Sequence, residues 1–393
     1  MKVIVAMDSF KGSCTATQAG EAARAGILRA DPDAEVLNIP VADGGEGTVE
    51  SIISNGRGKW HACEVTGPMG GHVSAGYGTL NDRMAVIEMS AASGLLLVPK
   101  EELNPLIATT YGTGELIRAA LDAGYRELLI GIGGSATNDG GMGMAQALGV
   151  SFRDAQGREL PFGGAALERL HAVDASGLDP RIADCRITVA SDVRNPLFGA
   201  DGASYVFGAQ KGATPEVMER LDRALRHYAD VLREGCGIDI AYLPGAGAAG
   251  GLGAALFAFL GADAMEGIDA VLGILSFSEK LAGVDFVLTG EGRTDGQTLF
   301  GKVPAGVAKV VKQHAPIPVF ILTGQVGEGA EALYEHGVDG IYAIADGPIT
   351  LDQSQARVAE LLARVSESVA RGVQAVRCAM DAPVMAREGR QMV

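Results

Sequence analysis

The sequence is short of positive charge. Its 393 residues include 32 Lys and Arg against 48 Asp and Glu, which gives a formal net charge of −16. Such a field repels nucleic acid and anionic membranes, so we expect neither as a partner. An anionic small molecule would have to be held locally, by backbone amides, a few cations or a metal.

Cysteine and histidine are also scarce, and neither forms a recognisable pattern. The five cysteines are odd in number and lack CxxC spacing, and the six histidines lack the spacing of paired metal ligands. We therefore expect reduced thiols and no Cys/His metal site. The opening residues MKVIVAMDSFKGS turn polar too soon for a signal peptide, so we expect a cytoplasmic protein.

One charge-free stretch, Ile240–Ala262, is long enough to span a bilayer. It contains six glycines and Pro244, however, and only Leu256–Leu260 is strongly apolar. This composition indicates a buried loop and helix.

Glycine, by contrast, is abundant: 56 residues, or about 14 per cent, roughly twice the usual share. Six of them lie in GIGGSATNDGGMGMA, residues 131–145, between an apolar run and a segment that can form a helix. Without Cβ atoms, backbone amides can approach a ligand, and a helix N-terminus carries partial positive charge. The stretch predicts a phosphate or carboxylate cradle; the alternative is a structural turn.

Both ends of the chain show the pattern of a parallel sheet. Lys2–Met7 and Glu35–Ile39 are apolar runs typical of buried parallel strands, and each is followed by a glycine-bearing loop and a helix. Thr15 and Gln18 have the spacing of a capping box, and the second helix is expected at about Thr48–Ser54. Later strands are expected at 187–190, 285–288, 319–322 and 340–344, and a last amphipathic helix at 353–375.

The middle of the chain differs, because Trp60–Leu97 contains short alternating runs separated by turns, which predict antiparallel strands. We infer that residues 1–60 plus 276–375 form one parallel-sheet domain, that 61–275 form an inserted mixed α/β domain, and that 376–393 form a C-terminal tail. A cleft between the domains is expected. Ligands of open α/β sheets bind beyond the carboxyl ends of strands.

Four further predicted loops carry acidic residues, most of them together with glycine, and follow predicted strands: DSFKGS (8–13), VADGGEGT (41–48), ASDVRNPL (190–197) and TGEGRTDGQTLFGK (289–302). PGAGAAGGLG (244–253) follows a weaker strand. Crowded carboxylates repel one another unless they share a cation. Phosphoryl transfer needs carboxylates for Mg²⁺, cations for phosphates and a base for the accepting hydroxyl. The cations of these segments are Lys11, Arg194, Arg293 and Lys302, and the carboxylates are Asp8, Asp43, Glu46, Asp192, Glu291 and Asp295.

Other readings are weaker. Gly296–Lys302 resembles a P-loop, but Val303 stands where the metal-binding Ser or Thr belongs. Gly245-x-Gly247-x-x-Gly250 matches a dinucleotide fingerprint after a poor strand, which leaves a nicotinamide-dependent dehydrogenase of a small hydroxy acid as the alternative. A serine hydrolase is disfavoured because no G-x-S-x-G is present.

The segments MDSFKGS, VADGGEGT, GGSATNDGG, PGAGAAGGLG and TGEGRTDGQTLFGK, in this order, resemble the bacterial type-1 glycerate kinases. The resemblance extends from the first strand to about Ala375. It implies an ATP-dependent kinase that acts on D-glycerate with Mg²⁺ and usually yields 2-phosphoglycerate. It also implies a flavodoxin-like (Rossmann-like) domain and a second α/β domain. We expect a monomer or a homodimer.

Catalytic roles are assigned from chemistry. Asp192 is the first choice as the base for the glycerate hydroxyl, and Asp43 is the second. Lys11 is expected to contact phosphate or the substrate carboxylate, and Arg194 the carboxylate or the transferring phosphoryl group.

Binding residues are assigned in the same way. Asp295 and Glu291 are expected to hold Mg²⁺, and Arg293 is an alternative to Arg194. The remaining predicted substrate- or nucleotide-binding residues are Ser9, Gly44, Gly45, Glu46, Gly133, Gly134, Ser135, Thr137, Asn138, Asp139 and Gly140.

Overall fold

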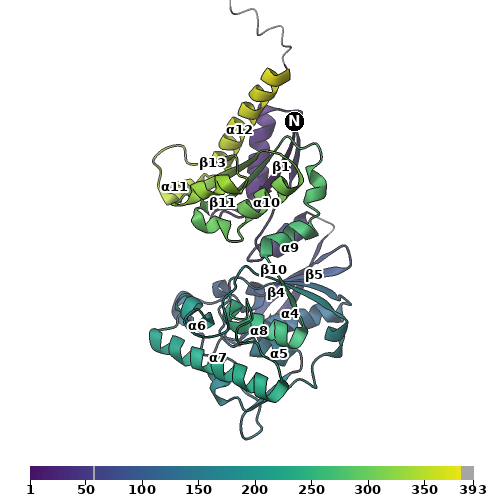
Figure 1. The fold of residues 1–393 in the computed structure, drawn as a ribbon, viewed down its shortest axis with the longest axis vertical. Coiled ribbons are helices and arrows are strands. Elements are labelled where there is room, and N and C mark those ends of the chain that lie inside the picture. Colours follow the sequence, from purple (N-terminus) through teal and green to yellow (C-terminus); the bar gives the residue numbers. More distant parts are fainter. Residues whose placement is uncertain (56–57, 382–393) are drawn as a thin grey trace, which may run out of the picture. The chain divides into compact units, whose positions relative to one another are not determined.

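A computed structural model describes residues 1–55 and 58–381 (Figure 1). It divides into two compact units: unit 1 is Met1–Val41 with Ser276–Val393, and unit 2 is Ala42–Leu275. The chain thus enters unit 2 at Val41–Ala42, before the predicted boundary at residue 60. The reason is that helix α2 (Thr48–Ser54) packs on strands β4 and β5 of unit 2.

Unit 1 contains one sheet of five parallel strands in the order β13-β12-β11-β1-β2. Val5 of β1 lies beside Asn38 on one side and Leu288 on the other. The apolar runs predict these strands because both faces of the sheet are covered. The bounds are β1 Lys2–Met7, β2 Glu35–Asn38, β11 Phe286–Thr294, β12 Val319–Val326 and β13 Gly340–Ala343.

Strand β11 is longer than expected. The segment 289–302 was predicted to be a loop, but Gly290–Thr294 continues the strand, and Thr294 pairs with Val326 of β12. A Cβ on Gly290 would collide with the carbonyl of Leu322, so glycine allows the close approach. The prediction of a loop from residue 289 was therefore wrong.

Helices α1 and α12 pack together on unit 1's sheet (Figure 1). The predicted capping box of Thr15 and Gln18 is confirmed at the start of α1. The predicted last helix is interrupted, because Arg357 (φ −110°, ψ 10°) separates α11 from α12. The bounds are α1 Ala16–Ala30, α10 Val303–His314, α11 Leu351–Ala356 and α12 Val358–Asp381.

Unit 2 contains a six-stranded sheet in the order β10-β9-β6-β5-β4-β3. The hairpin-like pairs β3–β4 and β4–β5 are antiparallel, as predicted for this stretch, whereas β5, β6, β9 and β10 run parallel. The bounds are β3 Lys59–Thr66, β4 His72–Leu80, β5 Met84–Glu88, β6 Glu127–Gly131, β9 Arg186–Ala190 and β10 Asp263–Met265; β7 Ser151–Arg153 and β8 Ala172–Asp174 form a separate pair.

The core of unit 2 lies between this sheet and its helices, around Phe152 and Tyr228. The uncharged stretch at 240–262 forms a loop and the largely buried helix α8; the loop was predicted to be buried, but residues 242–244 are exposed. Of the helices in the described residues, none has the length and hydropathy that a bilayer span requires. The bounds are α3 Ser90–Ser93, α4 Tyr111–Asp122, α5 Met142–Ala147, α6 Ala203–Phe207, α7 Pro215–Cys236, α8 Ala248–Leu260 and α9 Gly267–Ile274.

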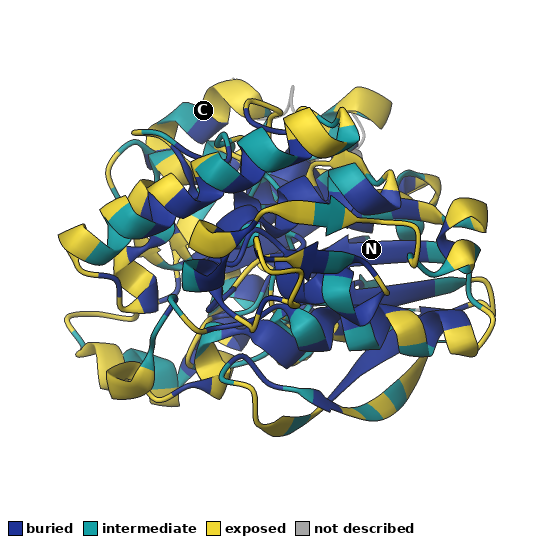
Figure 2. Cartoon of the chain, turned by 90° about the horizontal axis from the view of Figure 1, so that it is seen from below, coloured by how far each residue is buried: buried dark blue, intermediate teal, exposed yellow. Residues whose placement is uncertain are grey.

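Burial follows the layers. Figure 2 shows strands that are largely buried and helices whose outward faces are exposed. The predicted mixed α/β fold with parallel sheets is therefore confirmed.

Candidate active site

Four parallel strands of unit 2 end at the same edge. Their last residues, Glu88, Gly131, Ala190 and Met265, are partners in register across β5, β6, β9 and β10. The glycine-rich stretch 131–141 leaves from this edge. Ligands of parallel sheets bind at such edges.

Three predicted segments meet at this edge. A Cβ on Gly133 would lie 3.0 Å from the Cα of Gly45, and a Cβ on Gly44 would lie 2.9 Å from the Cβ of Ala190. Such short approaches leave room for little besides glycine. The backbone of 43–47 therefore lies directly against the turns that follow β6 and β9.

A fourth segment, 244–253, joins them. The Gly140 amide donates to the carbonyl of Gly250, and the Gly247 amide donates to the carbonyl of Asn195, both at 3.0 Å. We call residues 43–47, 131–141, 190–197 and 244–253 the unit 2 loop cluster. The glycines of the dinucleotide-like fingerprint are thus packed against protein backbone.

Asp192 lies half-buried in this cluster. Its Oδ1 accepts a hydrogen bond from the amide of Gly267, the first residue of α9, at 3.0 Å. The pKa of Asp192 is raised to about 6, chiefly by burial; the Gly267 bond opposes the shift, and the nearby carboxylates of Asp43, Glu266 and Asp269 add to it. A carboxylate with such a pKa can take up a proton near neutral pH.

The other predicted residues at this end of the sheet are more open. Asp43 accepts a hydrogen bond at Oδ1 from the Gly45 amide at 3.1 Å. Glu46 and Arg194 are exposed to solvent.

The 131–141 stretch divides into two parts. Gly133 and Gly134 are exposed, whereas residues 135–140 are buried. Asp139 is completely buried and accepts four hydrogen bonds, from the amide and hydroxyl of Thr110 and the amides of Gly141 and Gly143, at 2.9–3.2 Å. Burial raises its pKa, and these bonds oppose the shift. Asp139 therefore ties the stretch to the start of α4.

Residues close to Asp139 in the sequence also form hydrogen bonds within the protein. The amide group of Asn138 donates to the hydroxyl of Ser204 at 3.0 Å. The ammonium of Lys211 donates to Ser135 Oγ at 2.8 Å and to the carbonyl of Thr137 at 2.7 Å. Sequence reasoning missed Lys211, because its neighbours GAQKGATP carry no motif.

Two further predicted segments meet in unit 1. A Cβ on Gly292 would lie 3.8 Å from the backbone nitrogen of Lys11, so the turn after β1 lies beside β11. Lys11 is exposed. The Ser9 amide donates to Asp8 Oδ1 at 2.6 Å.

Both predicted metal ligands, Glu291 and Asp295, already accept hydrogen bonds from other residues of unit 1. Glu291 is buried and accepts hydrogen bonds from the Thr298 hydroxyl at 2.6 Å and the Lys302 ammonium at 3.0 Å. Burial raises its pKa, and both partners oppose the shift. Asp295 accepts from Arg293 Nε at 2.9 Å and from the Gln297 amide at 3.0 Å. Within residues 1–55 and 58–381, no group of three His, Cys, Asp or Glu side chains could hold a metal.

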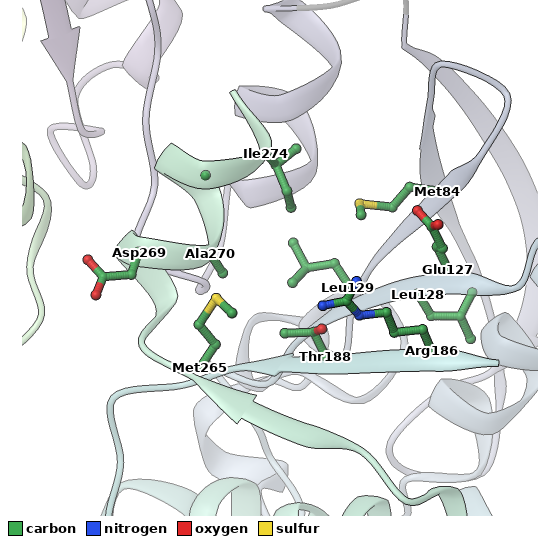
Figure 3. A pocket seen from close by; sticks show the side chains of 11 residues that line it. Met84, Glu127, Leu128, Leu129, Arg186, Thr188, Met265, Asp269, Ala270 and Ile274 are labelled. Atoms are coloured by element: carbon green, nitrogen blue, oxygen red, sulfur yellow. The ribbon is translucent and has the colours of Figure 1, made fainter. Parts of the chain in front are cut away.

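Two cavities lie away from these residues. A cavity of about 380 Å³ lies in unit 2 between the sheet and α9. Figure 3 shows the side chains that line it, among them Leu129, Arg186 and Thr188. A second hollow of about 650 Å³ lies in unit 1 beside Phe320 and Tyr342. No predicted site residue lines either, so the candidate site rests on the strand ends and not on cavity volume.

Comparison with known proteins identifies a matching protein family. A family model described as the glycerate kinase family matches residues 3–374. A glycerate kinase from Halalkalibacterium halodurans is 48% identical over 369 residues, which cover 94% of this chain and 97% of that protein. A glycerate 2-kinase from Escherichia coli K12 is 47% identical, with the same coverage.

A solved structure is similar as well. A crystal structure of a candidate glycerate kinase 2 from Salmonella typhimurium LT2 superposes with a TM-score of 0.86 at 48% identity. The match covers 96% of this chain and 99% of that one.

Proposed function

The chain belongs to the glycerate kinase family, and on that premise we propose that it transfers a phosphoryl group from ATP to D-glycerate, with 2-phosphoglycerate as the product. The chain is a glycerate kinase, a phosphotransferase with an alcohol group as acceptor. The donor, the product and the roles of individual residues are the proposal.

The observation that carries the mechanism is Asp192 at the carboxyl end of β9. Gly267 holds Oδ1 through its amide, which leaves Oδ2 for the hydroxyl of glycerate. With a pKa of about 6, the carboxylate is ionised at neutral pH and close enough to that pH to accept a proton.

Asp192 alone can accept the one proton that the glycerate hydroxyl loses in the reaction. The proton of the hydroxyl moves to Asp192 as the hydroxyl oxygen bonds to the γ-phosphorus, and the bond from phosphorus to the leaving oxygen of ADP breaks. The exposed amides of Gly133 and Gly134 and the guanidinium of Arg194 would hold anionic oxygens of the substrates.

Asp43, predicted as the second choice of base, is a better candidate for the magnesium contact than the predicted ligands Asp295 and Glu291. Mg²⁺ bound to ATP would neutralise phosphate charge, and such ions contact the protein through only one or two carboxylates. Glu291 and Asp295 already accept hydrogen bonds from Lys302 and Arg293. Asp43 accepts only a backbone amide and lies beside another carboxylate, whose repulsion a cation would relieve. We therefore assign the cation's protein contact to Asp43.

The residues of unit 1 keep their predicted roles as proposals. Ser9 would bind substrate or nucleotide, Lys11 would contact phosphate or the substrate carboxylate, and Arg293 would contact the carboxylate or the transferring phosphoryl group. Numbered along unit 1, its strands have the order 2-1-3-4-5, which supports a flavodoxin-like class for this unit. The cleft between units, the cytoplasmic location and the oligomeric state stay predictions.

The test is a coupled assay of ADP release with purified protein, ATP, Mg²⁺ and D-glycerate, and NMR of the product to locate the phosphate. L-glycerate is the control substrate. Failure to release ADP with D-glycerate would overturn the proposal. NAD(P) should not raise the melting temperature of the protein, and no absorbance change from nicotinamide reduction should appear. The reason is that the glycines of the dinucleotide-like fingerprint are packed against protein backbone.

A further inference from the structure

Lys211 is buried in an unusual setting. It ends the short 3₁₀ helix Ala209–Lys211 and is 1% exposed. Its ammonium contacts the Ser135 hydroxyl and a backbone carbonyl, and no carboxylate of the described chain forms an ion pair with it. Burial lowers its pKa to about 7, and the nearby Asp139 opposes the shift. A buried cation of this kind is costly unless an anion compensates it.

The turn that contains Ser135, the hydroxyl partner of Lys211, carries three backbone donors without an acceptor in the described chain. The backbone amides of Gly133, Gly134 and Ser135 donate to no acceptor among residues 1–55 and 58–381. Gly133 and Gly134 are exposed, and Gly134 has a φ of 74° that suits glycine. Successive unpaired amides in such a turn make a concave anion site.

The ammonium form of Lys211 fixes the direction in which Ser135 donates. An ammonium has three donors and no acceptor, so in this form the Ser135 oxygen accepts from Lys211 and its own proton is left for another acceptor. No described residue accepts that proton. An anion at the Gly133–Ser135 amides is the acceptor that this geometry offers.

We propose that Gly133, Gly134 and Ser135 form an anion site and that Lys211 is its positioning residue, acting through the Ser135 hydroxyl on an anionic oxygen of a substrate. Bound negative charge also favours the ammonium form of Lys211. The inference rests on the proposed function only for the identity of the substrate. The shared chemistry is an anionic oxygen, which a nucleotide phosphate or the glycerate carboxylate supplies.

The experiment measures binding directly. ATP and D-glycerate are titrated separately by calorimetry into the full chain and into Ser135→Ala, Lys211→Met and the double variant. Each single variant should weaken one and the same ligand about ten- to a hundredfold, the range for a hydrogen bond to a charged group. Loss of ATP affinity identifies a phosphate, and loss of glycerate affinity identifies the carboxylate.

Two further measurements distinguish a positioning role of Lys211 from a purely structural role. Because Lys211 acts through Ser135, the double variant should bind no more weakly than either single variant. Ser135→Thr keeps the hydroxyl and should restore most of the affinity. If Lys211→Met does not fold, Ser135→Ala and Ser135→Thr still provide the test.

The matched control is Ser204→Ala. It removes another buried hydrogen bond of the same stretch, the one from Asn138, and should lower stability while leaving both affinities unchanged. Wild-type affinity for both ligands in folded Ser135→Ala would overturn the inference, even if the wild-type enzyme phosphorylates D-glycerate. If the wild-type protein is inactive on D-glycerate, the proposed function is overturned. The ATP titration would still test whether the anion site binds a nucleotide phosphate.

Discussion

The backbone amide of Gly267 donates a hydrogen bond to Oδ1 of Asp192, with the two atoms 3.0 Å apart. A side chain that could otherwise rotate toward solvent is thereby fixed at the start of α9, near three other carboxylates.

Asp192→Asn should lower kcat by about 10²- to 10⁴-fold, the usual contribution of a general base. The amide oxygen can still accept from Gly267, so the fold should persist. ADP release measures turnover, and circular dichroism checks folding. Asp263→Asn, an exposed carboxylate on β10, is the control and should keep wild-type turnover. Near-normal turnover of Asp192→Asn would remove the residue from this role.

The activity of the wild-type enzyme should fall as the pH drops through about 6. Burial and neighbouring carboxylates raise the pKa of Asp192 to that value, and a protonated carboxyl cannot act as a base. The measurement is kcat as a function of pH at saturating substrates. An acid limb near 4, the ordinary range of aspartate, would contradict the assignment.

Asp192→Asn should also make the protein more stable at pH 7.5. The pKa of this group is higher in the folded than in the unfolded state, so its favourable contribution is complete below about pH 4 and is lost as the pH rises through 6. After allowance for solvent at this half-buried site, the gain should be about 1–2 kcal/mol. Urea unfolding at pH 7.5 and pH 4 measures it. The difference should shrink at pH 4, and a variant less stable than wild type at pH 7.5 would refute the prediction.

Asp139→Ala should destabilise the protein by about 3–5 kcal/mol, because it leaves the buried donors of Thr110, Gly141 and Gly143 without an acceptor. Urea denaturation gives the free energy of unfolding. Asp201→Ala, an exposed carboxylate of the same unit, should change it little. Equal stability of the two variants would show that the four hydrogen bonds do not hold the stretch.

Asp43→Asn should raise the Mg²⁺ concentration needed for half-maximal activity by about tenfold or more. Glu291→Gln should leave this concentration unchanged, because Glu291 already contacts Thr298 and Lys302. Both values come from ADP release at fixed ATP and increasing Mg²⁺. The reverse ranking would return the cation to Glu291 and Asp295.

Local patterns predicted much of the fold. The strand Lys2–Met7 and the helix Thr48–Ser54 have the predicted bounds, because an apolar run and a glycine-bounded amphipathic segment depend on near neighbours. The length of strand β11 was underestimated, because its extension through Thr294 depends on pairing with β12, a strand remote in sequence.

The candidate site was harder to predict than the fold. The sequence marks 131–141 as special but does not show that Gly133 is exposed while Asp139 faces the interior. It gives no sign of Lys211, which reaches Ser135 across 76 residues. Nor does it show that the partly buried Glu88 accepts a hydrogen bond from the Val49 amide at the start of α2, with a pKa raised by desolvation. Side-chain direction depends on tertiary packing, which no motif encodes.

The sheet of unit 1 is built from both ends of the chain, with β1 between β2 and β11. A ribosome therefore releases β1 and β2 long before β11 exists, and all of Ala42–Leu275 emerges in between. Unit 2 is continuous and can fold during synthesis, whereas the first two strands must wait with one edge unpaired. Translation order thus makes unit 1 the last part of the enzyme to be completed.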